Sequence, residues 1–228
     1  MNISGIIKSS FIDYPGKICT VIFLAGCNFR CGYCHNPELV KDNHISPVIN
    51  INEFINFLNK RKKFLDAVCI SGGEPTIYPD LPHLIKKIKD MGFEIKLDTN
   101  GTNPEVLKNL IGEGLLDYVA MDIKGPLDRY GAIVRHSVDL ATVRESAGLL
   151  IQKTKESRLN CEFRTTVCRE LLTESDLKRM IDEFPCPPKW FLQAFKNPGE
   201  ILDQGGIYSA YSKNEMKEMG RRLCVNVR

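Results

Sequence analysis

Three cysteines lie close together in the first part of the chain, at positions 27, 31 and 34, with the spacing C-x3-C-x2-C. Thiolates on so short a loop can each bind a different iron of one [4Fe-4S] cubane. No further cysteine is nearby, so the fourth iron would stay open. An open iron can be chelated by the amino and carboxylate groups of a methionine-type sulfonium, which one electron from the cluster can then cleave. We therefore predict that Cys27, Cys31 and Cys34 bind a cluster and form the catalytic centre.

Two other metal groups are compatible with the same residues. Cys31-Gly32-Tyr33-Cys34-His35 matches the C-x-x-C-H signature of c-type haem attachment, but attachment needs export and no signal peptide is found. Zinc bound by the three cysteines and His35 is chemically sensible, because thiolate and imidazole both suit zinc. Zinc would leave the polar motifs described next without a role. A non-catalytic zinc or electron-carrier module is kept as an alternative interpretation.

Three further polar motifs each follow a short apolar run. They are Gly72-Gly73-Glu74, Asp98-Thr99-Asn100-Gly101 and Asp122-Ile123-Lys124. In a parallel α/β protein the carboxyl ends of the strands meet at one edge, where the chemistry is done. A single aspartate or lysine of this kind is usually part of a surface ion pair or a turn. Their recurrence at consecutive strand ends indicates a site.

The elements that must position these motifs alternate between short apolar runs and amphipathic stretches, which is typical of repeated βα units. Strands are predicted at residues 20–25, 67–71, 94–98, 118–123, 161–167 and 190–195. Helices are predicted at residues 51–64, 81–91, 105–113, 140–155, 174–184 and 214–223. Right-handed crossovers wind such units into a barrel or a doubly wound sheet, and the pattern alone does not choose between them. Because no linker divides the chain, we expect one domain over residues 1–228.

The cysteine loop and the double glycine resemble motifs of a known family. C-x3-C-x-aromatic-C after a first strand resembles the radical S-adenosylmethionine (SAM) superfamily, and Ser71-Gly72-Gly73-Glu74-Pro75 resembles that superfamily's glycine-glycine-glutamate motif. The resemblance implies an α/β fold, a partial (β/α)6 TIM-like barrel. It also implies that Tyr33 lies against the adenine of SAM, and that backbone carbonyls of Gly72, Gly73 and Glu74 accept hydrogen bonds from the SAM amino group.

Two strand-end motifs, residues 96–101 and residues 121–124, narrow the resemblance to the glycyl-radical-enzyme activating enzymes. Within that group the sequence is most similar to the activating proteins of anaerobic ribonucleoside-triphosphate reductase, notably over residues 12–17, 34–40 and 97–103. The resemblance implies that Asp122 and Lys124 meet the carboxylate and ribose region of SAM. It implies that Asp98, Thr99 and Asp122 frame a monovalent cation. It also assigns Asn36 and Arg164 to the SAM site.

By this resemblance the protein is a radical SAM activase. The expected reaction takes an electron from reduced flavodoxin or ferredoxin, cleaves SAM to methionine and a 5'-deoxyadenosyl radical, and removes a hydrogen atom from a glycine of anaerobic ribonucleotide reductase. A small-molecule reaction like that of carboxy-deazaguanine synthase would use the same residues and is kept as an alternative. The family's substrate-loop segment, Asp-Gly-Pro-Gly, reads Asp13-Tyr14-Pro15-Gly16 here. No extra cysteines lie between His35 and Val68, so we expect one cluster only.

The composition argues against several other classes of protein. Lysine and arginine total 31 against 28 aspartates and glutamates, and a net charge of +3 is too weak to indicate nucleic-acid binding. Neither a signal peptide nor a run of roughly 18 apolar residues occurs, so we expect a cytoplasmic protein that does not bind membranes. We expect the other six cysteines to be reduced and to act as small buried hydrophobic residues. They are Cys19, Cys69, Cys161, Cys168, Cys186 and Cys224.

Overall fold

The computed structural model describes residues 1, 3–41, 49–184, 189–196 and 199–228. Its framework is one eight-stranded sheet in which the strands follow one another in sequence order, from β1 to β8. β1 is antiparallel to β2, and every later pair is parallel. The strands are β1 (Ile3–Ser10), β2 (Cys19–Leu24), β3 (Ala67–Gly72), β4 (Glu94–Thr99), β5 (Tyr118–Asp122), β6 (Asn160–Val167), β7 (Trp190–Ala194) and β8 (Asn226–Val227).

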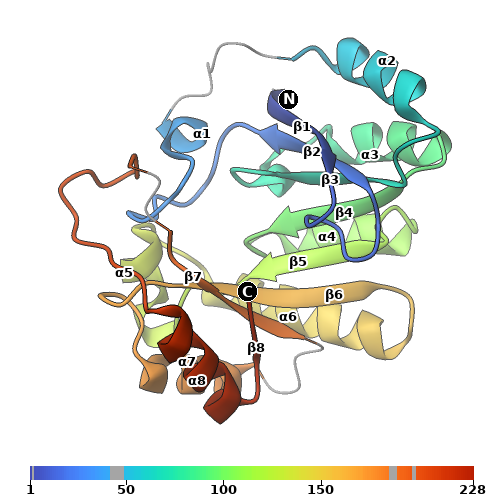
Figure 1. The fold of residues 1–228 in the computed structure, drawn as a ribbon. Coiled ribbons are helices and arrows are strands. Elements are labelled where there is room, and N and C mark those ends of the chain that lie inside the picture. The colour runs from blue at the N-terminus through green and yellow to red at the C-terminus, as the bar shows by residue number, and fades with distance from the viewer. Residues whose placement is uncertain (2, 42–48, 185–188, 197–198) are drawn as a thin grey trace.

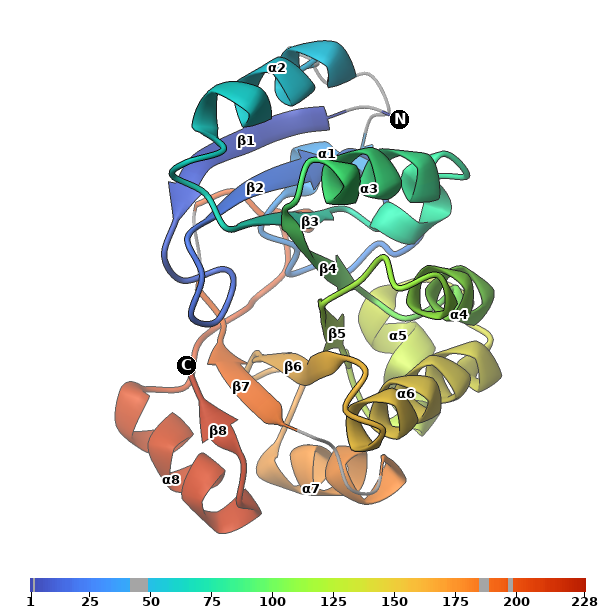
Figure 2. The same ribbon diagram turned by 90° about the vertical axis from the view of Figure 1, so that its right-hand side faces the viewer.

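The longer helices lie around the outside of this sheet, which curves from β1 at one edge to β8 at the other (Figure 1, Figure 2). Two 3-10 helices follow strands β3 and β5, and they are η1 (Pro75–Ile77) and η2 (Leu127–Arg129). The α-helices are α1 (Pro37–Lys41), α2 (Ile51–Arg61), α3 (Leu81–Asp90), α4 (Pro104–Gly112), α5 (Tyr130–Val134), α6 (Leu140–Lys155), α7 (Glu174–Glu183) and α8 (Lys213–Leu223).

The six predicted strands are confirmed as β2 to β7, and the six predicted helices as α2, α3, α4, α6, α7 and α8. Parallel strands with helices outside them form the partial TIM-like barrel that was expected. The sequence pattern missed both edge strands. β1 has exposed and half-buried positions where a central strand would be continuously apolar, and β8 has only two residues. Periodicity over such segments is too weak to reveal a strand.

The helices cover the sheet with apolar faces at helical spacing. In α3, the side chains of Leu81, Leu84, Ile85 and Ile88 are all buried. Burial stabilises a side chain of this size by about 1.5–3 kcal/mol relative to exposure. α7 begins with a capping box. The Thr173 side chain accepts from the backbone N–H of Asp176, and the Asp176 side chain accepts from the backbone N–H of Thr173. These contacts hold the helices, and through them the strand ends, in fixed positions.

The inner face of the curved sheet carries polar residues. Side chains two positions apart in a strand share a face, so Lys96 lies beside Asp98 in β4, and Glu162 lies beside Arg164 in β6. The register between β5 and β6 aligns Asp122 with Arg164. Residues 42 positions apart in the sequence are thereby brought into contact.

Most of the cysteines outside the cluster loop behave as expected. Cys19, Cys69, Cys161 and Cys168 are buried, and none of the cysteines that the structure describes forms a disulfide. Cys224 is exposed, and the prediction that it is buried was wrong. It ends α8 with a φ of 55°, where its backbone N–H caps the helix and its side chain faces away from the core. Cys186 lies outside the described residues.

Candidate active site

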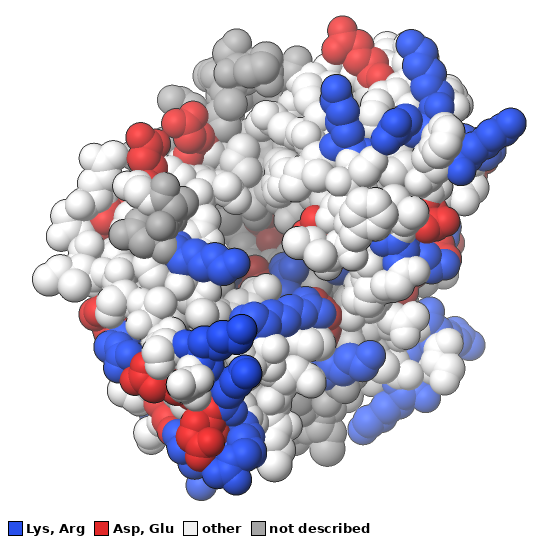
Figure 3. All heavy atoms as spheres, viewed as in Figure 1, with Lys and Arg blue, Asp and Glu red and all other residues white. Residues whose placement is uncertain are grey.

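The cysteine loop and the strand ends line one cavity of about 420 Å³ at the carboxyl edge of the sheet. A deep hollow is visible at the centre of the molecule, with charged groups at its floor (Figure 3). Every residue predicted for the site lines this cavity, with the exception of Glu74. The residues lining it that the sequence analysis did not assign to the site are Asp13, Phe29, His35, Val40, Ser71, Asn100, Thr166 and Gln193.

The cysteine loop follows β2 and is held at its start and in its middle by hydrogen bonds to neighbouring segments. Gly26 N–H donates to the carbonyl of Leu39 (2.7 Å), and the Tyr78 hydroxyl donates to the carbonyl of Ala25 (2.6 Å). Further along, Arg30 N–H donates to the carbonyl of Val134 at the end of α5 (2.9 Å). The loop is therefore anchored to the scaffold at several points, which fixes the directions of its three thiols.

The double glycine lets β3 approach the start of the cysteine loop very closely. Gly73 N–H donates to Leu24 O and Glu74 N–H donates to Gly26 O, both at 2.8 Å. Gly72 has a φ of +115°, which side-chain-bearing residues rarely adopt. A Cβ atom on Gly73 would lie 1.8 Å from the Gly26 carbonyl oxygen. Glycine is therefore required at both positions for the cysteine loop to take this path.

The side chain of Glu74 is fully buried outside the cavity. Its carboxylate accepts hydrogen bonds from the Thr99 hydroxyl (2.8 Å) and from the backbone N–H groups of Thr76 (3.0 Å) and Asn100 (2.6 Å). It thus ties the end of β3 to the end of β4. Glu74 therefore supports the cavity from outside through its side chain, and the contact predicted between its backbone and SAM stays a prediction.

A second link joins the cysteine loop to the end of β4. Asn100 Nδ2 donates to Asn28 Oδ1, and Asn28 Nδ2 donates to the Thr102 hydroxyl, both at 2.8 Å. These residues were not paired from the sequence. A signal was present, because Asn28 makes the cysteine loop polar and Asn100 lies within a strand-end motif, but nothing local shows that the two side chains meet.

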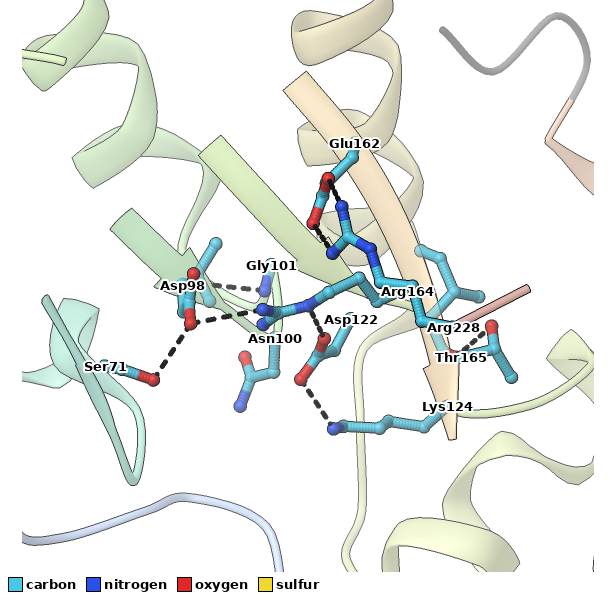
Figure 4. Close-up of polar contacts among 12 residues, drawn as sticks. Ser71, Asp98, Asn100, Gly101, Asp122, Lys124, Glu162, Arg164, Thr165 and Arg228 are labelled. Carbon is cyan, nitrogen blue, oxygen red and sulfur yellow. Dashed lines mark hydrogen bonds and ion pairs between the residues drawn. The ribbon is translucent and has the colours of Figure 1, made fainter. Parts of the chain in front are cut away.

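Five charged residues on β4, β5 and β6 form a continuous row of ion pairs, hereafter the charge row, of which Figure 4 labels Asp98, Arg164, Asp122 and Lys124. Lys96 contacts Asp98, which also accepts from Arg164 Nη1 (3.2 Å) and from the Ser71 hydroxyl (3.0 Å). Arg164 Nε donates to Asp122 (2.8 Å), and Lys124 Nζ donates to the other oxygen of that carboxylate (2.9 Å). Lys96 is buried and does not line the cavity, whereas Arg164 and Lys124 do, and these two cations suit a carboxylate-bearing ligand.

The cations of the charge row keep its carboxylates ionised. Burial alone would raise the pKa of Asp122, but Arg164 and Lys124 outweigh burial and hold this pKa at about 2. The pKa of Asp98 is lowered in the same way, because Arg164 and Lys96 overcome its burial. Both carboxylates therefore already accept from protein cations. The monovalent cation expected beside Asp98, Thr99 and Asp122 stays a prediction.

Replacing Asp122 with asparagine should change how stability depends on pH. The folded-state pKa of about 2 lies below the unfolded value of about 3.9, so the ionised carboxylate contributes about 2 kcal/mol above pH ~4, and this is lost as the pH falls towards ~2. The difference in unfolding free energy between the wild type and Asp122→Asn should therefore shrink by about 2 kcal/mol over that range. Urea unfolding of cluster-free protein at several pH values measures it, and a constant difference would contradict the ion pairing.

The spacing of the three thiols along one loop is compatible with a cluster. In the part of the chain that the structure describes, no three histidine, cysteine, aspartate or glutamate side chains converge on a single metal position. A zinc ion needs its ligands around one point, whereas each thiolate of a cubane binds its own iron. His35 stacks on Phe195, with 5.3 Å between ring centroids. Burial raises the pKa of the Cys27 thiol to about 12, so binding iron must displace its proton.

Comparison with known proteins agrees with these features. Residues 21–183 match the family model of the Radical SAM superfamily. A Methanocaldococcus jannaschii protein, provisionally named glycyl-radical enzyme activating enzyme, is 34% identical over 221 residues, which cover 96% of this chain and 90% of that protein. A pyruvate formate-lyase-activating enzyme of Staphylococcus epidermidis is 36% identical over 94 residues, which cover 39% of this chain and 37% of the relative.

A solved structure shares the fold. The crystal structure of a radical SAM methyltransferase from Sphaerobacter thermophilus matches with a TM-score of 0.69 at 14% identity, over 96% of this chain and 67% of that chain. At so low an identity the likeness concerns the fold alone. The family match and the full-length relative go further: the chain belongs to the radical SAM superfamily and, within it, to the glycyl-radical enzyme activating enzymes, a family whose cofactors are a [4Fe-4S] cluster and SAM.

Proposed function

We propose that this activase binds its cluster through Cys27, Cys31 and Cys34 and holds SAM at the adjoining strand ends. The observation that carries the proposal is that all three thiols line the same cavity as four members of the charge row, Asp98, Asp122, Lys124 and Arg164. Lys124 and Arg164 would face the SAM carboxylate, because they are the two cations of the charge row that line this cavity. Further contacts are assigned to Asn36, to Asp98, Thr99 and Asp122, and to the backbone of Gly72, Gly73 and Glu74.

Tyr33 is assigned to the adenine of SAM. It lies between two cluster ligands, lines the cavity, and packs 6.4 Å from the ring of Tyr208. Its hydroxyl is buried, and no hydrogen-bond partner is found for it among the described residues. A buried polar atom without a partner costs free energy, so a ligand group at this position would complete the environment that the chain leaves open.

With both cofactors bound, one-electron reduction of SAM supplies a 5'-deoxyadenosyl radical. The residues of the chain orient SAM and neutralise its carboxylate. Buried aromatic side chains, among them Phe29 and Tyr33, keep water away from the loop that carries the thiols. The pairing of Asp98 and Asp122 with three cations leaves no free general base among these carboxylates, as expected of hydrogen-atom rather than proton removal.

A protein is the substrate that the rim of the cavity fits best. Asp13, in the connection between β1 and β2, lines the cavity. The two residues before it are apolar and largely exposed, Phe11 at 74% and Ile12 at 86%. Large apolar side chains at such exposure are typical of surfaces that bind another protein. A partner whose glycine enters the cavity could cover both, and we propose that Asp13 contacts its backbone.

We infer that the partner is an anaerobic ribonucleoside-triphosphate reductase and that the electron comes from reduced flavodoxin or ferredoxin. The support for this partner is the similarity of residues 12–17, 34–40 and 97–103 to its activating proteins. The pyruvate formate-lyase-activating enzyme named above matches over only 39% of the chain, so the similarity supports pyruvate formate-lyase as the partner less strongly. Reduced thiols and a low-potential electron donor fit the cytoplasm as the site of action. No helix among the described residues combines the length and the apolar composition needed to cross a bilayer.

Electron paramagnetic resonance tests the proposed activation. Reconstituted enzyme, reduced in the presence of SAM, should generate a glycyl radical doublet on an anaerobic ribonucleotide reductase, and substituting the reductase's radical glycine with alanine should remove the signal. A doublet on another glycyl radical enzyme alone would reassign the partner. Absence of a doublet with every glycyl radical enzyme, while SAM is still cleaved, would favour the alternative of a small-molecule substrate, such as that of a carboxy-deazaguanine synthase.

A further inference from the structure

A second ion pair, between buried Glu162 and partly exposed Arg228, lies beside the charge row on the inner face of β6. Glu162 is 1% exposed and is two residues before Arg164. Both oxygens of its carboxylate accept from the guanidinium of Arg228, Oε1 from Nη1 and Oε2 from Nη2, each at 2.8 Å. The Tyr118 hydroxyl donates to Oε2 at 2.8 Å. Figure 4 shows this pair next to Arg164, with the two guanidinium groups directed at different carboxylates.

The edge of the sheet holds Arg228 in place. β8 pairs with β7, and Arg228 N–H continues this pairing by donating to Leu192 O at 2.9 Å. The guanidinium lies over the ring of Phe191, 3.7 Å from its centroid. A planar guanidinium fixed by a stacked ring and a bidentate carboxylate loses little freedom for each bond it makes. The short strand β8 therefore places a partly exposed cation against the buried carboxylate of Glu162.

A buried carboxylate attracts any cation within reach, because burial removes it from water. Two arginines face Glu162 from the inner side of the sheet, Arg228 and Arg164. Burial opposes the charge of Arg164, but the carboxylates of Asp122, Asp98 and Glu162 raise its pKa well above the usual value. Arg164 is thus attracted by Glu162 while it is bonded to the other two carboxylates. Its bond to Asp98 is the longer of the two, at 3.2 Å against 2.8 Å.

We propose that Arg228 is a positioning residue for the SAM site: by neutralising Glu162 it leaves the guanidinium of Arg164 to Asp98 and Asp122, which keeps the charge row in the arrangement that meets SAM. The inference rests on the proposed role of Arg164 towards SAM. Arg164 lies in β6 and Arg228 directly follows β8, 64 positions further along the sequence. Without Arg228, the carboxylate of Glu162 attracts the guanidinium of Arg164, which lies two residues away in β6, and the bond from Arg164 to Asp98 is lost.

SAM affinity of the reconstituted enzyme, measured by anaerobic titration calorimetry, tests this proposal. We expect Arg228→Ala to raise the dissociation constant for SAM roughly tenfold. Adding Glu162→Gln to that variant should restore the affinity to within about twofold, because a neutral amide no longer attracts Arg164. Arg222→Ala is the matched control: it removes an arginine of α8 that pairs with Glu174 and Glu218 at the surface, and the affinity should not change.

Each outcome decides the proposal. An Arg228→Ala variant that binds SAM like the wild type overturns it. If the affinity falls and Glu162→Gln does not restore it, Arg228 acts only by holding β8 and the proposal is wrong. If Arg228→Ala does not fold, thermal unfolding of the double variant decides, because removing the buried charge should restore folding and continued failure to fold contradicts the idea. SAM binding is measured without any partner enzyme. If the proposed glycyl-radical activation fails, the measured SAM affinities therefore still decide the role of Arg228.

Discussion

The Cys31→Ala variant should form no measurable 5'-deoxyadenosine from SAM, a loss of at least about a thousandfold. Cys31 is buried within the cysteine loop and lines the cavity with the two other thiols. Two thiolates cannot hold a cubane in which three irons need protein ligands. Iron analysis and chromatography of the nucleoside product after anaerobic reduction with dithionite measure the two effects together.

Cys161→Ala is the control for this experiment. Cys161 is also buried, but it lies in β6 against Thr154 of α6 and does not line the cavity. Its loss should lower stability by about 1 kcal/mol and leave both iron content and SAM cleavage unchanged. If Cys31→Ala retained its cluster and its activity, the cluster would have to be bound elsewhere, and the assignment of the three thiols would fail. One zinc and no iron in the wild type would support the alternative of a zinc module.

Gly73→Ala should destabilise the protein by about 3 kcal/mol or more and prevent cluster incorporation. The new methyl group would lie 1.8 Å from Gly26 O and 3.2 Å from Cys27 N. Both are backbone atoms that precede or belong to the first cluster ligand, so the overlap cannot be relieved by a side-chain rotation. The cysteine loop must shift, and the hydrogen bond from Glu74 N–H to Gly26 O is lost with it.

Gly148→Ala provides the same substitution where space is available. Gly148 lies within α6, and among the described residues no atom apart from its own helix's backbone and its two chain neighbours lies within 4 Å of the position that its Cβ would take. Alanine there should stabilise by about 0.5–1 kcal/mol because it favours the helix. Urea unfolding of cluster-free protein and iron content after reconstitution distinguish the two variants. A Gly73→Ala protein that unfolds and binds iron like the wild type would show that β3 and the cysteine loop can separate without harm.

The sequence predicted the central part of the fold and the location of the site. Buried parallel strands are continuous apolar runs, and their helices are amphipathic, so both signals lie within about ten consecutive residues. The cysteine spacing is local in the same sense, and so is each strand-end motif. Since the carboxyl ends of parallel strands share an edge, gathering these motifs in one cavity followed from the fold class. The resemblance to a known family then gave the chemistry.

Glu74 shows the limit of such reasoning. The resemblance to the family motif assigned its backbone, with that of the two glycines, to the SAM amino group, but the motif says nothing about its side chain. In the structure its carboxylate is buried and accepts hydrogen bonds from Thr99 and Asn100, more than twenty positions away. The edge strands show a similar limit, because a strand with one free edge or with two residues has no clear periodicity.

The sequence by itself determined which residue types are available for the chemistry: three thiols on one loop, two glycines and a set of strand-end charges. The tertiary structure decided which charges pair, placing Arg164 between Asp98 and Asp122 and Arg228 against Glu162. The reason is physical. Ion pairs between strands depend on the register of the sheet and on burial, and both arise from the packing of the whole chain rather than from any stretch of neighbouring residues.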